Sequence, residues 1–182
     1  MIVVAPSRQS NSAMIDWLSS CEPPRIVRTI DDLAHVRVRW LEGKDRKWIH
    51  LDGASMPDLP SAYSTLIHAF SLPAYFGRNL AALRECLTDA DVLGSSAFAV
   101  YFENPTLALK DANSEALLGL LDAFANAAEE LGQPIHEAAS WDRPALPFHV
   151  LLGPDNNDPR LQSYPLVPDS GRPFISSSTS TG

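Results

Sequence analysis

Cysteine is scarce in this sequence, with only Cys21 and Cys86 among 182 residues. Two thiols are too few for the disulfide framework of a small secreted scaffold, and they lack the spacing of a metal site. Long apolar runs are also missing, since no window approaches the roughly 18 residues of a membrane span. Residues 1–5 carry no basic segment and make a poor signal peptide. We therefore expect a soluble, cytoplasmic protein without a metal ion or a membrane partner.

Basic residues are outnumbered, with 14 Lys and Arg against 22 Asp and Glu and a formal net charge of −8. This balance argues against direct binding to nucleic acid or to an anionic membrane. The excess lies in residues 47–152, which hold five bases and thirteen acids. Many cytosolic domains are acidic for solubility alone. The alternative is that this segment attracts a basic protein partner.

Composition divides the chain into three parts. Residues 1–46 form an N-terminal extension, residues 47–152 form the main domain, and residues 153–182 form a C-terminal tail. The tail contains five Pro, six Ser and three Gly. It buries too little apolar surface to offset the entropy of ordering it, so we expect it to be mostly irregular. Its apolar segments at 164–168 and 174–175 remain able to dock on the main domain.

The apolar periodicity predicts an α/β fold with a small three-stranded parallel sheet covered by helices. The strands are expected at 46–51, 97–102 and 148–152, and the helices at 11–20, 60–71, from 77 onwards and at 114–131. A further strand is expected within 25–30. Alternation in 36–41 and again in 46–51, around a link that contains Gly43, predicts a β-hairpin. We expect this hairpin to add an antiparallel strand beside the first core strand, and the alternatives are a small subdomain or self-association through the extension.

One segment carries a recognisable pattern. It reads Leu72-Pro73-Ala74-Tyr75-Phe76-Gly77-Arg78-Asn79-Leu80-Ala81-Ala82-Leu83-Arg84-Glu85-Cys86-Leu87-Thr88-Asp89. This segment resembles the barstar family of intracellular ribonuclease inhibitors, whose pattern is Leu-Pro-x-Tyr-aromatic-Gly-x-Asn-Leu-Asp-Ala-Leu-Trp-Asp-Cys-Leu. The likeness in element order extends over about 47–152 and leaves out the extension and the tail.

The resemblance implies a partner-binding surface made of a helix and the aromatic loop before it. Glu85 is implied to enter a basic ribonuclease site in place of a substrate phosphate and to pair with Arg, Lys or His. The residues implied to contact the partner are Tyr75, Phe76, Gly77, Asn79, Leu80, Ala81, Arg84, Glu85, Thr88 and Asp89. No cofactor, metal ion or catalytic residue is implied.

Three residues depart from the family pattern. Ala81 stands where the family has a contacting Asp, Arg84 replaces a Trp, and Glu85 replaces the central Asp. Arg84 weakens the local negative potential and is able to pair with Glu85 internally. These changes indicate a different ribonuclease, weaker binding, or a toxin domain that is not a ribonuclease. Acidic contacts from the long helix are candidates only, at Glu129 and Glu130.

Several of these residues also have a purely structural interpretation. Phe76 and Leu80 fit a core, Gly77 suits a demanding backbone conformation, Asn79 is a typical helix cap, and Cys86 fits a buried thiol. A glutamate on a solvated helix face, such as Glu85, indicates no function by itself, and only its place in this segment suggests one.

An enzyme is the third class to consider. His50 and Asp52 flank the end of a predicted strand, and His136 and His149 lie near the last one. No phosphate loop, dinucleotide fingerprint, nucleophile elbow or helical His pair accompanies them. The sequence thus predicts an intracellular, non-enzymatic bacterial inhibitor of a secreted or toxin ribonuclease. The alternative is a binding, immunity or regulatory module of the same fold that grips another protein.

Overall fold

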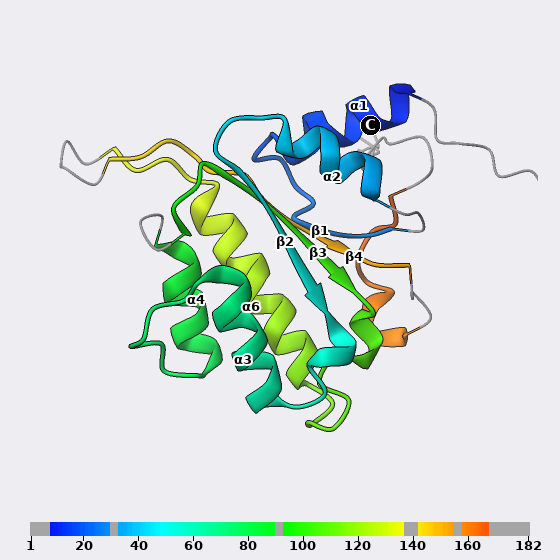
Figure 1. Ribbon diagram of the computed structural model, residues 1–182, viewed down its shortest axis with the longest axis vertical. Helices are drawn as coiled ribbons and strands as arrows, with labels where there is room; N and C mark the ends of the chain where they lie inside the picture. Colours follow the sequence, from blue (N-terminus) through cyan, green and yellow to red (C-terminus); the bar gives the residue numbers. More distant parts are fainter. Residues whose placement is uncertain (1–7, 30–32, 90–92, 137–141, 155–157, 168–182) are drawn as a thin grey trace, which may run out of the picture.

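A four-stranded sheet, all of whose strands run parallel, organises the computed structural model (Figure 1). The structure describes residues 8–29, 33–89, 93–136, 142–154 and 158–167. The strand order is β1-β4-β3-β2. The strands are β1 (Ile26–Arg28), β2 (Arg46–Asp52), β3 (Ala97–Glu103) and β4 (Phe148–Leu152). The predicted α/β class is therefore correct, but the sheet has four strands where three were expected.

Helices cover both faces of the sheet. On one face lie α3 (Leu59–Phe70), α4 (Leu80–Thr88) and α6 (Ala116–Leu131), and on the other lie α1 (Arg8–Leu18) and α2 (Ala34–Leu41) (Figure 1). Short 3-10 turns follow β2, β3 and β4, as η1 (Gly53–Ser55), η2 (Pro105–Leu107) and η3 (Pro159–Leu161). The continuous apolar run of β3 reflects this double cover, because both faces of a central parallel strand are buried.

Alternate residues of β3 enter two separate cores. Phe98, Val100 and Phe102 face α3, α4 and α6, where the rings of Phe70, Phe124 and Phe148 join them. Ala97 and Ala99 face the extension, whose buried side chains include Trp17, Leu18, Val36 and Trp40. The extension thus serves as the second cover of the sheet, on the side away from α4.

The predicted hairpin is wrong, because residues 34–41 form helix α2. The pattern Val36-Arg37-Val38-Arg39-Trp40 satisfies a two-residue alternation, but Val36 and Trp40 also lie four residues apart on one helical face. The structure buries these two and leaves Val38 63% exposed. The packing of Val36 and Trp40 on the sheet therefore selects the helical period over the two-residue period of a strand. No strand of the extension lies beside β2 in the described part of the chain.

The expected strand within 25–30 is present as β1, but it pairs with β4 at the opposite edge. The tail continues this edge, because Arg28 N donates to the Pro165 carbonyl at 2.8 Å and Val167 N donates to the Arg28 carbonyl at 2.8 Å. Leu161 and Val167 are buried. Docking of the apolar segment at 164–168 is confirmed as far as Val167, while residues 168 and 174–175 lie outside the described residues.

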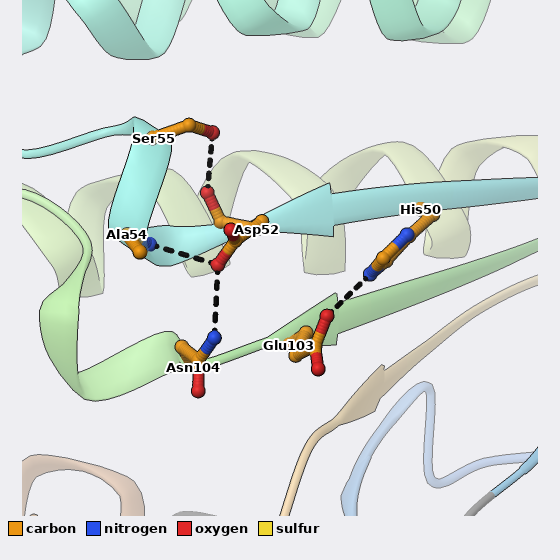
Figure 2. A network of polar contacts seen from close by, with 6 residues as sticks. All are labelled: His50, Asp52, Ala54, Ser55, Glu103 and Asn104. Atoms are coloured by element: carbon orange, nitrogen blue, oxygen red, sulfur yellow. Dashed lines mark hydrogen bonds and ion pairs between the residues drawn. The ribbon is translucent and has the colours of Figure 1, made fainter.

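The ends of β2 and β3 are joined by a polar contact (Figure 2). The Asp52 carboxylate accepts from Asn104 Nδ2 at 2.9 Å and from Ala54 N at 3.0 Å. The bond from Asn104, followed by the one from Ala54, lowers the pKa of Asp52 below its usual value. Gly53 permits this junction, because a Cβ there would lie 2.1 Å from the Asn104 carbonyl oxygen.

Replacing Gly53 by alanine should therefore destabilise the fold. The obstacle is backbone, which cannot rotate away, and overpacking of this kind costs about 1–3 kcal/mol. Chemical denaturation of the Gly53→Ala variant measures the loss. Ala54→Ser, at the exposed neighbouring position, is the matched control and should unfold like the wild type. Equal midpoints for all three proteins would contradict the assigned close approach.

His149 is a buried histidine on the extension side of β4. Its Nε2 donates to the Ser20 carbonyl at 2.8 Å, and the Trp17 ring lies 4.2 Å away, centroid to centroid. Burial, which disfavours the charged form, lowers the pKa of His149 to about 4. Its role is therefore structural.

The buried His149 predicts a loss of stability in mild acid. Between pH 6.5 and pH 4 the histidine binds a proton in the unfolded state, where its pKa is about 6.5, but stays neutral in the folded state. The free energy of unfolding therefore falls as the pH drops from about 6.5 to about 4. The shift corresponds to about 3 kcal/mol in total. Denaturation of wild type and His149→Gln between pH 7 and pH 4.5 tests this, and the variant should show the smaller change. Parallel curves would refute the assignment.

Candidate partner-binding site

Helix α4 has one side buried in the core and one side that faces solvent. Leu83, Cys86 and Leu87 are buried against the core, as the apolar spacing predicts. Ala81, Arg84 and Glu85 are exposed, while Leu80 and Thr88 are partly buried. The buried side of α4 packs against α6. The structure therefore brings the predicted contact residues of the helix onto one outward surface, except Leu80, which packs against the core.

The loop before α4 separates its two aromatic residues. Phe76 is 7% exposed and packs edge-on against the Tyr63 ring, with centroids 5.9 Å apart. Tyr75 is 75% exposed. The core interpretation of Phe76 is thus the one the structure supports, and Tyr75 is left as the exposed aromatic of the loop.

Asn79 caps α4 and also ties the loop to it. Its Oδ1 accepts from Ala82 N at 2.8 Å, and its Nδ2 donates to the Gly77 carbonyl at 3.1 Å. The left-handed residue of this turn is Arg78, with φ 48°, and not Gly77. A Cβ at Gly77 would instead make a tight contact of 3.1 Å with the Asn79 amide nitrogen, which would have to shift by a few tenths of an ångström. The expectation of an unusual backbone conformation at Gly77 is therefore corrected.

The charges of α4 do not cancel each other. The Glu85 carboxylate makes no hydrogen bond or ion pair among the described residues. Arg84 points to α6, where its Nη2 lies 3.4 Å from Glu130 Oε2. The internal pairing of Arg84 with Glu85 allowed by the sequence does not occur. Glu85 is left as an exposed anion on a rigid element.

The C-terminal end of the helix holds the last of the predicted contacts. Thr88 Oγ1 donates to the Glu85 backbone carbonyl at 3.1 Å, and Asp89 is exposed where the helix ends. Cys86 is buried as expected. Burial first, and then the charges of Asp89 and Glu85, raise the pKa of its thiol. This cysteine is a packing residue, not a nucleophile.

A groove of about 540 Å³, which we did not expect from the sequence, adjoins this surface. Leu80 lines it together with residues of α3 and of the start of α6. Glu115 and Asp122 bring two exposed carboxylates to it. The signal in the sequence was their spacing of seven residues, which places Glu115, directly before α6, on the same side as Asp122 within the helix.

His50, one of the histidines that suggested an enzyme, pairs with a carboxylate. His50 Nε2 lies 2.8 Å from Glu103 Oε2, and both side chains are about half exposed (Figure 2). Asp52 is occupied with Asn104, and the Ser55 hydroxyl donates to the Asp52 backbone carbonyl at 2.7 Å. The arrangement is a surface pair at the end of two strands and lacks the nucleophile–base contact of a hydrolytic triad.

The residues that the structure describes contain no cluster of three or more His, Cys, Asp or Glu side chains suited to a metal ion. None of their helices is both long and apolar enough to cross a membrane.

Comparison with known proteins identifies the main domain. No curated protein sequence matches the chain. The sequence model of the family described as Barstar (barnase inhibitor) matches residues 46–152. That range begins at the start of β2, ends with β4, and contains α4 with its loop. Since the match covers more than half of the chain, this protein belongs to the barstar (barnase inhibitor) family.

Proposed function

We propose that this protein is an intracellular inhibitor that blocks the basic active site of a ribonuclease with α4 and the Tyr75 loop. Members of its family inhibit ribonucleases and are not enzymes. The observation that carries the proposal is the Glu85 carboxylate, which is exposed, without an internal cation, and held on a helix whose opposite face is buried. A carboxylate preorganised in this way forms strong charge-assisted hydrogen bonds to arginine or lysine.

The charge of the main domain supports a basic target. The five bases and thirteen acids of residues 47–152 give an acidic domain, and complementary charge speeds the association of two proteins. A nuclease has to be inhibited before it damages the cell that makes it, so the inhibitor has to associate with it rapidly. Because a secreted or toxin nuclease is made in the bacterial cytoplasm, we propose that the inhibitor acts there.

The departures from the family pattern bear on which nuclease is bound. Ala81 is exposed and offers no carboxylate, and Arg84 adds a cation beside Glu85. The surface is therefore less anionic than the family pattern predicts. We infer a target that differs from barnase, or a weaker complex with a barnase-like enzyme.

A second candidate is a module of the same fold that grips a protein other than a ribonuclease. Helix α2 favours it, because Val38 and Leu41 are 63% and 46% exposed on the extension. Affinity purification with α2 variants separates the two functions. Loss of the partner in Val38→Ser/Leu41→Ser, with retention in Glu85→Ala, would favour this second candidate.

Inhibition assays test the first candidate directly. Purified barnase and any nuclease domains encoded beside this gene are mixed with the protein, and residual RNA cleavage is measured. We expect one of these enzymes to be inhibited at equimolar concentration. Full cleavage by all of them would overturn the proposed function.

Within that assay, Glu85→Ala should weaken inhibition far more than Thr88→Ala. Removing a central carboxylate at a hot spot costs about 2 kcal/mol or more, which is a loss of about 30-fold or more in affinity. Thr88 is the matched control, because it lies one turn from Glu85 but is partly buried and bonded to its own helix. Equal small losses for the two variants would place the interface elsewhere.

A further inference from the structure

Arg84 is a cation on a surface built to meet a basic partner. Its side chain is 52% exposed and follows Ala81 by one turn on the outward side of α4. An uncompensated guanidinium here would repel the cations that Glu85 is proposed to attract. The structure supplies one compensating group, the Glu130 carboxylate of α6, at 3.4 Å.

The position of Glu130 is unfavourable for its own helix. It lies in the last turn of α6, which contains Glu129 as well and no basic residue. The negative end of the helix dipole disfavours carboxylates in a last turn. A half-exposed ion pair contributes little to folding stability. The contact between Glu130 and Arg84 therefore has its clearest consequence at the surface of α4.

We propose that Glu130 is a positioning residue that draws the Arg84 guanidinium towards α6 and neutralises it, so that Glu85 meets the partner's cations without a competing charge. This inference rests on the proposed function. It explains how this family member can carry Arg84 in place of the tryptophan of the family pattern, next to Glu85, and still keep an anionic contact surface. Glu130 need not touch the partner to have this effect.

The pair itself is tested in the free protein. The NMR signal of the Arg84 guanidinium is compared in wild type, Glu130→Gln, Glu129→Gln and Glu85→Gln. We expect its chemical shift and hydrogen exchange to change in Glu130→Gln alone. Glu129→Gln is the matched control, from the same helical turn but without the Arg84 contact. A signal that responds to Glu85→Gln and not to Glu130→Gln would overturn the inference.

The consequence for binding is tested by a double-mutant cycle, with whichever nuclease the protein inhibits in the assays above as the probe, whether barnase or a nuclease domain encoded beside the gene. Glu130→Gln should weaken binding about twofold to fivefold when Arg84 is present, with a larger effect at low salt, and should change it less than twofold in an Arg84→Ala background. A direct contact of Glu130 with the partner would instead produce equal losses in both backgrounds, which would overturn the inference. A strong loss in Arg84→Ala alone would overturn it as well, since Arg84 would then bind the partner itself.

The outcomes also separate this inference from the proposed function. If Glu85→Gln loses binding while Glu130→Gln behaves alike in both backgrounds, the proposed function stands and the inference fails. If wild type binds neither barnase nor the nuclease domains encoded beside the gene, the proposed function fails, and the inference fails with it.

Discussion

Burial of one side of α4 is the constraint on which the proposed contact surface depends. Leu83 and Leu87 are fully buried, and α4 packs along α6, which in turn packs on β4. A nine-residue helix has little stability of its own in water, because nucleating it is unfavourable and only tertiary packing offsets that. The same packing orients Ala81, Arg84 and Glu85 outward. Their exposure therefore follows from the core beneath them, with Asn79 setting where the helix begins.

The sequence predicted the secondary structure well in segments whose apolar residues fitted only one period, either that of a helix or that of a strand. The long helix, the buried strand at 97–102 and the last strand all appear close to their predicted bounds. The segment at 36–41 fitted two periods, and the sheet face available to Val36 and Trp40 decided for a helix. The pairing of β1 with β4, and of the tail with Arg28, joins residues more than a hundred positions apart. Local patterns carry no information about such pairings, which depend on loop closure and shared burial.

The sequence predicted which residues form the candidate surface, but it did not predict how their charged groups pair. The outward side of α4 followed from helical spacing, and the cap at Asn79 followed from residue type. The inward turn of Phe76 depends on Tyr63, a residue of another helix, so the sequence left its two roles open. The pairing of Arg84 with Glu130 spans two helices in the same way. Which neighbour neutralises a charged side chain is a tertiary property, and it decides here whether Glu85 is available.

The two ends of the described chain share one small core. Val167 packs in the same cluster as Met14 and Trp17 of α1, and both lie across the sheet from α4. An attachment made at α1 or at Val167 would therefore start on the face of the sheet away from α4. Immobilising or fusing the protein there would leave the proposed contact surface on the opposite face.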